Sequence, residues 1–207
     1  MREELAGVIL AGGKSSRMGT PKELLEWRGR TLIAHLQQEI AGTGLPCLIV
    51  SNRPETLIEK GQLISGADVE ITRDLVPSAG PVSGIVTAFR MRSEEVLLML
   101  SCDLPFAERS QLRRLIAFAG QAGSWDAVVV RAQERLHPLF ALYHRRTQDH
   151  FEEALQAGQY RLMDVLQKLR VVETPPGLID PWAACNVNTP EEYRAALREQ
   201  KKRESER

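Results

Sequence analysis

The sequence predicts an α/β fold of three layers, with a mostly parallel sheet, helices on both faces and an antiparallel excursion in the second half. Two observations support this prediction. In the first half, short apolar segments alternate with segments whose apolar residues recur at helical spacing, and the connections are short. After residue 126, two apolar segments follow one another with only a polar turn between them, which is typical of a β-hairpin.

The first expected strand covers residues 7–10 and leads into a loop rich in glycine and positive charge. The residues that give the loop this character are Gly12, Gly13, Lys14, Arg17, Gly19 and Lys22. Glycine lets the backbone approach an anion and fixed cations offset its charge, so the loop is predicted to bind phosphate. Gly13 stands where a P-loop requires lysine, and the G-x-G-x-x-G motif of dinucleotide-binding proteins is absent. A basic surface loop without a ligand is the alternative for this segment alone.

The other elements of the first half continue the alternation. Helices are expected over residues 32–40, from about residue 54 and from residue 82, and strands over residues 45–51, 69–72 and 96–100. Four residues that suit a binding site each follow a strand directly: Gly12, Asn52, Asp74 and Asp103. Ligands of parallel sheets bind beyond the carboxyl ends of the strands. We therefore expect these four residues to gather at one edge of the sheet.

The second half mixes helices with the expected hairpin. A helix is expected over residues 111–119, strands over 127–130 and 136–143, helices over 146–157 and 161–167, and an edge strand over 169–173. Asn186 is expected to end a last strand, after which Thr189 caps a helix and Pro190 occupies its first position. The mixed charges after Leu197 predict a tail that frays.

Asp103 is the main candidate for metal binding. It follows the most apolar strand and precedes Pro105, so a stiff turn holds its carboxylate at the edge of the sheet. Mg²⁺ commonly takes one or two protein carboxylates together with substrate phosphates and water, which suits this position. An aspartate that only forms the turn is the alternative. Asp74 could contact the metal, a ribose hydroxyl group or only the backbone of its own turn. Asn188 is a further candidate ligand of the metal.

The positive charges of the first loop are expected to contact phosphate. Lys14, Arg17 and Lys22 lie within nine positions among glycines, a composition that no helix would tolerate. We therefore assign Arg17 and Lys22 to phosphate contact in preference to a solvated charge run. No set of serine, histidine and acid comes together convincingly. Cys102 suits a small buried residue better than a nucleophile, and His137 suits a structural role at a turn somewhat better than contact with a second substrate.

Composition limits the class of protein. The chain has 207 residues, enough for one large domain with a core, and Lys plus Arg balance Asp plus Glu at 27 each. No overall field would therefore attract nucleic acid or an anionic membrane, and no apolar run approaches the roughly 20 residues that cross a bilayer. Three separated cysteines argue against a disulfide framework or a zinc site. Arg2 to Glu4 precede the first strand directly, so no signal peptide is expected, and the cytoplasm is the expected location.

With these residues assembled, the chain resembles the molybdenum cofactor guanylyltransferases, the MobA family, within the nucleotidyltransferases of GT-A-like, Rossmann-like α/β fold. The segments that carry the resemblance are Leu10-Ala11-Gly12-Gly13, Arg17-Met18-Gly19, Lys22, Asn52, Asp74, Gly80-Pro81-Val82-Ser83-Gly84, Cys102-Asp103-Leu104-Pro105, His137-Pro138-Leu139-Phe140-Ala141-Leu142 and Asn186-Val187-Asn188-Thr189-Pro190. The first loop alone indicates only the superfamily, whereas the segments that begin at Cys102 and His137 together indicate this branch. Pro21 stands where many guanylyl-transferring members carry aspartate, and Pro-Lys is also common in relatives that transfer a cytidylyl group. The segment at Cys102 favours GTP.

The resemblance implies a reaction and a set of residues. The terminal phosphate of Mo-molybdopterin would attack the α-phosphorus of GTP, and pyrophosphate would leave. Residues implied in GTP binding are Leu10, Ala11, Gly12, Gly13, Lys22, Asn52, Asp74 and Asp103, with Asp103 also holding Mg²⁺. Asp103, Lys22 and Arg17 would be catalytic.

We expect one domain over residues 1–207, with a nucleotide-binding half (1–105) and an acceptor-binding half with a C-terminal helix (106–207). Molybdopterin-synthesis proteins or acceptor molybdoenzymes are the expected protein partners, without nucleic acid or membrane. Two alternatives stay open. One is a cytidylyl- or sugar-nucleotidyltransferase of the same fold, and the other is a non-catalytic carrier that binds GTP and the cofactor.

Overall fold

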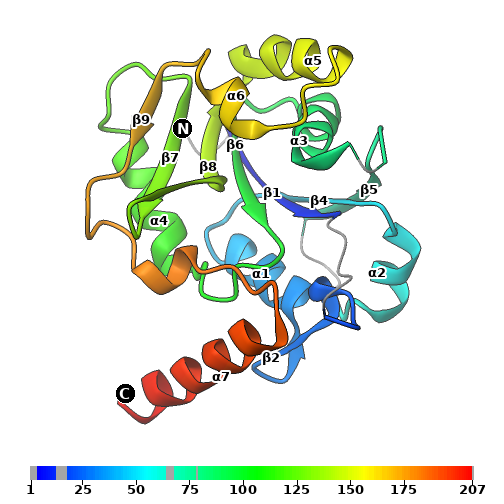
Figure 1. Cartoon of the computed structure of the whole chain (residues 1–207), viewed down its shortest axis with the longest axis vertical. Helices are drawn as coiled ribbons and strands as arrows, with labels where there is room; N and C mark the ends of the chain where they lie inside the picture. The colour runs from blue at the N-terminus through cyan, green and yellow to red at the C-terminus, as the bar shows by residue number, and fades with distance from the viewer. Residues whose placement is uncertain (1–3, 13–17, 64–67, 78, 207) are drawn as a thin grey trace.

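A seven-stranded sheet forms the centre of the computed structural model, which describes residues 4–12, 18–63, 68–77 and 79–206 (Figure 1). Its strands are β1 (Leu5–Ala11), β4 (Cys47–Ser51), β5 (Val69–Arg73), β6 (Val96–Ser101), β7 (Ala127–Ala132), β8 (Arg135–His144) and β9 (Val171–Glu173), in the order β5-β4-β1-β6-β8-β7-β9. β1 runs parallel to β4 and β6, and β4 runs parallel to β5. β8 is antiparallel to β6 and β7, and β9 lies at the edge, parallel to β7. The predicted mostly parallel sheet with an antiparallel excursion is confirmed.

Helices cover both faces of this sheet. They are α1 (Leu32–Ala41), α2 (Pro54–Lys60), α3 (Gly80–Met91), α4 (Arg109–Ala119), α5 (Gln148–Gln156), α6 (Leu162–Leu166) and α7 (Pro190–Ser205). Side chains alternate between the faces of a strand, so neighbouring residues enter different cores. Ile9 and Ile49 pack in the cluster that contains α1 and α4, whereas Val8 and Val50 pack in the cluster of α3, α5 and α6. Figure 1 shows α3, α5 and α6 on one side of β1 and α1 on the other. Within the described ranges, no helix is long and apolar enough to cross a membrane.

The segment before α7 differs from the prediction. A 3₁₀ turn, η4 (Pro181–Ala184), is followed by residues 185–188, which are described and form no strand. The N–H of Val187 donates to the carbonyl oxygen of Asp103 at 2.9 Å, and that carbonyl belongs to a loop, so no ladder of strand hydrogen bonds can continue. The expected strand end at Asn186 is therefore wrong. The predicted cap is confirmed, because Thr189 Oγ1 accepts from Glu192 N at 3.2 Å and Glu192 accepts from Thr189 N at 3.0 Å.

The C-terminal tail is helical, so the prediction that it frays is wrong. α7 continues to Ser205 because Arg203 near its end has tertiary partners. The guanidinium of Arg203 donates to the two carboxylate oxygens of Asp180 at 2.8 and 3.2 Å and lies 5.1 Å from the ring centre of Phe106. Cation–π and bidentate ion pairs of this kind hold the helix end against the body of the protein.

An aromatic cluster connects three distant parts of the chain. Trp27 meets Phe106 edge to face with ring centres 5.0 Å apart, and Phe106 meets Trp182 at 5.5 Å. Trp27 belongs to the small hairpin of β2 (Glu26–Trp27) and β3 (Arg30–Thr31). Each ring lies within five residues of a polar residue of the carboxyl edge of the sheet; these are Lys22, Asp103 and Asn186. The cluster therefore fixes the three segments relative to one another.

Candidate active site

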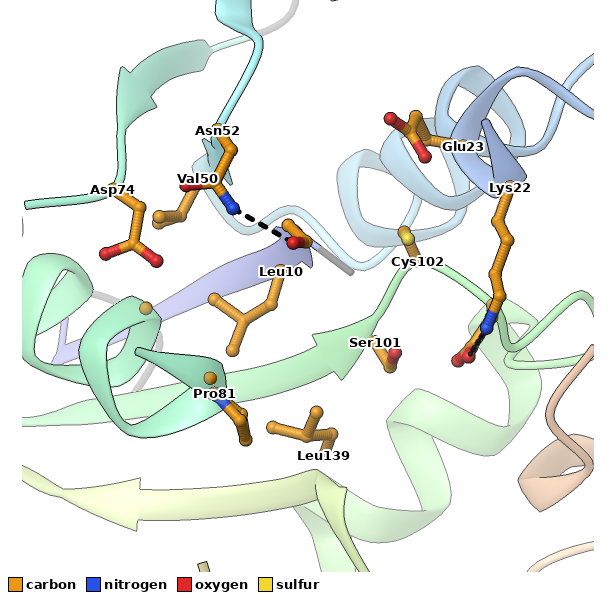
Figure 2. Close-up of a pocket in the computed structure, with 14 residues that line it drawn as sticks. Leu10, Lys22, Glu23, Val50, Asn52, Asp74, Pro81, Ser101, Cys102 and Leu139 are labelled. Atoms are coloured by element: carbon orange, nitrogen blue, oxygen red, sulfur yellow. Dashed lines mark hydrogen bonds and ion pairs between the residues drawn. The ribbon is translucent and has the colours of Figure 1, made fainter. Parts of the chain in front are cut away.

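A pocket opens at the carboxyl ends of β1, β4 and β6, beside the N-terminal end of α3 (Figure 2). The four residues predicted to gather at this edge all line it: Gly12, Asn52, Asp74 and Asp103. Leu10 and Lys22, which the resemblance implied, line it as well. Ala11 lies at the end of β1, is buried and does not belong to the lining. Gly13 and Arg17 lie outside the described residues.

Lys22 lies at one end of the pocket between two oxygen atoms. Its Nζ donates to Asp103 Oδ2 at 3.1 Å and to Asn188 Oδ1. The second carboxylate oxygen of Asp103 accepts from Asn186 Nδ2 at 2.6 Å. With the bond from Val187 N to the Asp103 carbonyl, side chain and backbone both join the C-terminal segment to Asp103. We call this group of a lysine, a carboxylate and two amides the cationic end of the pocket, after its lysine.

The oxygen pair around Lys22 fits a divalent cation. The carboxylate oxygen of Asp103 and the amide oxygen of Asn188 are directed at the same positively charged group. Mg²⁺ prefers oxygen ligands and often takes one or two carboxylates while phosphates and water supply the rest. Among the described residues, no group of three or more His, Cys, Asp or Glu side chains suits a metal. The donor set therefore suits a metal completed by substrate oxygens, not one enclosed by protein.

Asp74 and Asn52 lie on the other side of the pocket, away from Lys22 (Figure 2). Asp74 Oδ1 accepts hydrogen bonds from hydroxyl groups of α3, whereas no hydrogen bond to its Oδ2 comes from the described residues. Asn52 Nδ2 donates to the carbonyl oxygen of Gly12 at 2.9 Å. Asn52 Oδ1 is buried and has no hydrogen-bond partner in the part of the chain that is described. Within the described ranges, this side of the pocket thus holds two acceptor oxygens, one of them buried, that receive no hydrogen bond.

Two glycines make room for these contacts. A Cβ atom at Gly12 would lie 2.9 Å from Asn52 Nδ2, so any other residue would displace the Asn52 amide. A Cβ atom at Gly84 in α3 would lie 3.1 Å from a methyl group of Leu10. Glycine at these two positions therefore lets the β4 loop and α3 approach the end of β1.

Apolar side chains separate the two polar ends. Leu10, Val50, Pro81 and Leu139 line this part of the pocket, and Figure 2 shows the side chains of Leu10, Pro81 and Leu139 close together. Leu139 lies in a stretch of β8 where the register with β7 shifts, which places it outside the regular ladder. Bulges commonly redirect a side chain next to a site. The wall suits the flat, apolar faces of a base or a ring.

Two residues at the site were not predicted. Glu23, which follows Lys22, lines the pocket with a buried side chain and pairs with Arg53 at 3.1 Å. Asn186 was named only as the end of an expected strand and within the resemblance, yet it holds the Asp103 carboxylate. The spacing of Asn186 and Asn188 was the available signal, because alternate residues of an extended segment point the same way. Glu23 is buried beside a partner 30 positions away, Arg53, so no local sequence pattern predicts its burial.

The interpretation of Cys102 agrees with its environment. The side chain is buried, and burial raises the pKa of its thiol well above the usual range, so the nucleophilic thiolate is disfavoured. His137 in β8 lies with Nε2 3.3 Å from the carbonyl oxygen of Ala132 across the hairpin, and burial lowers its pKa. This hydrogen bond within the hairpin is the structural role preferred for His137.

His35 of α1 supports the loop that follows Asp103. Its Nε2 lies 3.0 Å from the carbonyl oxygen of Pro105, which can only accept, so this nitrogen carries the proton. Burial, and then the charge of Arg28, lowers the pKa of His35 from 6.5 to about 4. The folded protein therefore holds this imidazole neutral, and protonation of His35 disfavours the fold.

We expect His35 to make stability dependent on pH. The unfolded chain binds the proton near pH 6.5 and the folded chain only near pH 4, so the contribution is complete above pH 6.5 and is lost as the pH falls towards 4. The shift corresponds to on the order of 3 kcal/mol in the free energy of unfolding. His35→Gln replaces the imidazole N–H donor by an amide N–H donor, and the glutamine side chain does not titrate. Urea unfolding of the wild type and of His35→Gln is measured between pH 4 and 7.5. The free energy of unfolding should rise more steeply with pH in the wild type, and an equal pH dependence of the two proteins would contradict the role of His35.

The fold and site define a class of protein. A glycine-containing loop, a lysine and an aspartate meet at the carboxyl edge of a mostly parallel sheet. A nucleotidyl transferase from Methanothermobacter thermautotroptrophicus has the same fold, with a TM-score of 0.70 at 18% identity over 94% of this chain and 98% of that chain. The fold is that of the nucleotidyltransferases.

The chain belongs to the family of MobA-like NTP transferase domains, which matches residues 7–173, and it is therefore a nucleotidyltransferase. It is similar to the probable molybdenum cofactor guanylyltransferase of Bacillus subtilis, with 33% identity over 193 residues, 90% of this chain and 91% of that relative. The molybdenum cofactor guanylyltransferase of Ectopseudomonas mendocina is 33% identical over 199 residues, 96% of this chain and 94% of the relative. The crystal structure of molybdopterin-guanine dinucleotide biosynthesis protein A from Archaeoglobus fulgidus has a TM-score of 0.79 at 25% identity, covering 95% of this chain and 99% of that chain.

Proposed function

We propose that the protein transfers GMP from GTP to the terminal phosphate of Mo-molybdopterin and releases pyrophosphate. A phosphate oxygen of the acceptor forms a new bond to the α-phosphorus of GTP while the bond between the α-phosphorus and the bridging oxygen breaks. The electron pair of that bond leaves with pyrophosphate, and the product is molybdopterin guanine dinucleotide. The relatives from Bacillus subtilis and Ectopseudomonas mendocina support the choice of substrates.

The single observation that favours guanine is a pair of oxygen atoms, Asp74 Oδ2 and Asn52 Oδ1, that accept no hydrogen bond from the described residues. Asn52 Oδ1 is buried, so its amide would turn towards the base when the nucleotide binds. The Watson–Crick edge of guanine offers two adjacent donors, N1–H and the 2-amino group. Cytosine offers one amino group next to the acceptor N3, so it would leave one protein acceptor unmatched. An unmatched buried acceptor costs about 1–3 kcal/mol. We therefore assign Asp74 and Asn52 to the base, although Pro21 alone would also suit a cytidylyltransferase.

We assign the cationic end to the triphosphate. Lys22 and Arg17 would offset charge that develops on the leaving pyrophosphate. Asp103, with Asn188, would hold Mg²⁺, which when bound would neutralise charge on phosphate oxygens. Asp103 Oδ2 contacts the Lys22 ammonium at 3.1 Å, so the ammonium would turn from this carboxylate towards the phosphates when the metal binds at Asp103. Nucleotidyl transfer needs positioning and charge more than a protein nucleophile, in agreement with the buried Cys102 thiol.

We propose that the two halves of the chain divide the substrates. Residues 1–105 would contribute Leu10, Gly12, Asn52 and Asp74 to the nucleotide, together with Ala11 at the end of β1 and Gly13, which lies outside the described residues. Residues 106–207 would bind the acceptor and add Asn186 and Asn188 to the cationic end. The reaction would take place in the cytoplasm, with molybdopterin-synthesis proteins or acceptor molybdoenzymes as partners.

Nucleotide choice is the decisive test. Each of the four ribonucleoside triphosphates is incubated with Mo-molybdopterin, and both pyrophosphate and the dinucleotide product are measured. We expect kcat/KM to be at least about tenfold higher with GTP than with CTP, because CTP would leave one acceptor of the protein unmatched. Preference for CTP would make the protein a cytidylyltransferase. Binding of GTP without pyrophosphate release would make it a carrier, and Asp103→Ala provides the background rate.

A further inference from the structure

The carboxylate of Asp74 is held by one oxygen only. Asp74 Oδ1 accepts a hydrogen bond from Ser83 Oγ and another from Thr87 Oγ1 at 3.1 Å, and Val76 N lies 3.4 Å away. Ser83 and Thr87 are one turn apart on α3, and both are completely buried. A carboxylate otherwise rotates broadly about its terminal torsion. The two hydroxyl groups therefore determine which oxygen turns to the pocket.

The hydrogen atoms available to this network are limited. Each hydroxyl group has one hydrogen, and each oxygen also accepts from the loop: Ser83 Oγ from Val76 N at 3.1 Å, and Thr87 Oγ1 from Leu75 N at 3.0 Å. The Thr87 hydrogen can go to Asp74 or to the Ser83 carbonyl at 2.9 Å, and the charged acceptor forms the stronger bond. Both hydroxyl groups are thus oriented by backbone N–H groups, and both donate to the same carboxylate oxygen.

The hydrogen bonds from Ser83 and Thr87 to Asp74 are not needed to close the turn that contains Asp74. Val76 N could complete the turn through Asp74 alone, as aspartate commonly does. Instead, two buried hydroxyl groups of a helix that itself lines the pocket occupy Oδ1 and leave Oδ2 without a donor among the described residues. The result is a carboxylate with one fixed and one available oxygen, on the same side of the pocket as Asn52 (Figure 2).

We propose that Ser83 and Thr87 are positioning residues for base selection. By fixing Oδ1 they place Oδ2 of Asp74 where it accepts from the 2-amino group of guanine, while Asn52 remains assigned to N1–H, and so they determine how strongly a purine with the 2-amino group is preferred. This role rests on the proposed use of GTP. It concerns selectivity, whereas the cationic end with Lys22 and Asp103 performs the transfer.

The test compares GTP with ITP, which lacks only the 2-amino group, by kcat/KM for pyrophosphate release with Mo-molybdopterin. We expect the wild type to prefer GTP and Thr87→Val to reduce the GTP to ITP ratio by about tenfold, as expected for the loss of one hydrogen bond to a charged group. Thr87→Ser should restore the ratio, because it restores the hydroxyl group. Ser83→Ala should also lower the GTP to ITP ratio, and it serves as a second measurement if Thr87→Val folds poorly.

A matched control is Thr43→Val. Thr43 is also a buried threonine whose hydroxyl group donates to a helix carbonyl, that of Ile40 at 2.6 Å, but it lies outside the pocket lining. Its GTP to ITP ratio should equal that of the wild type. An unchanged ratio in both Thr87→Val and Ser83→Ala, or a wild type that does not distinguish GTP from ITP, overturns this inference while GTP transfer stands. Preference for CTP overturns the proposed function itself.

Discussion

Replacement of Asp103 by alanine or asparagine is expected to reduce pyrophosphate release by about 10³-fold or more, since metal-assisted charge stabilisation contributes several kcal/mol to the transition state. The Asp103 carboxylate accepts hydrogen bonds from Lys22 and Asn186, so its loss removes both the proposed cation ligand and a partner of Lys22. Asn keeps the shape of the side chain and removes only the charge, which separates chemistry from packing. Turnover measured over a range of Mg²⁺ concentrations, together with circular dichroism, checks this result.

The control for Asp103 is Asp149→Asn on the exposed face of α5, which should have normal turnover. GTP binding by the Asp103 variants should persist, because Asn52 and Asp74 lie at the other end of the pocket (Figure 2). Near-normal turnover of a folded Asp103 variant at controlled metal concentration would remove Asp103 from the assigned chemistry.

Lys22→Ala or Lys22→Met is expected to reduce kcat by about 10²–10³-fold, the magnitude typical for loss of one preorganised group that stabilises developing charge. The ammonium is fixed between Asp103 and Asn188, so the effect should appear in kcat more than in KM for GTP. Lys22→Arg keeps the charge but cannot occupy the same point between two oxygens, and it should recover only part of the activity. Single-turnover kinetics at saturating GTP provide the measurement.

Lys201→Met, at an exposed position of α7, is the matched control and should leave kcat unchanged. If Lys22→Met raised KM for GTP while kcat stayed normal, Lys22 would contribute ground-state binding only. That outcome would contradict the assignment of Lys22 to the leaving pyrophosphate.

The fold was predictable because its signals are local. Alternation of strands and helices shows directly in the spacing of apolar residues, and the rule for carboxyl ends of parallel strands then brought Gly12, Asn52, Asp74 and Asp103 to one pocket. The predicted hairpin over residues 127–143 also forms, as β7 and β8. Element ends were less accurate, since caps and tertiary contacts decide them.

The errors arise where a partner is distant in the chain. The last turns of α7 have a charged sequence that is typical of a solvated tail, but Arg203 contacts Asp180 and Phe106. The segment at Asn186 resembles a strand end, yet its partner is Asp103, 83 positions earlier. Glu23 is a charged residue whose burial depends on Arg53. Pairings of this kind need the assembled fold and cannot be read from spacing.

The aromatic contacts of Trp27, Phe106 and Trp182 have a consequence for the order in which a growing chain acquires its parts. Leu10, Asn52 and Asp74 emerge in the first 74 residues, and Ser83 and Thr87, which hold the Asp74 carboxylate, follow by residue 87, so this side of the pocket is available early in synthesis. The oxygen atoms of Asn186 and Asn188 emerge more than 80 residues after Asp103, and Trp182 must dock on Phe106 to bring them there. Under the proposed function, the residues assigned to the base are therefore translated well before those that complete the cationic end, which is the last part of the pocket that translation can supply.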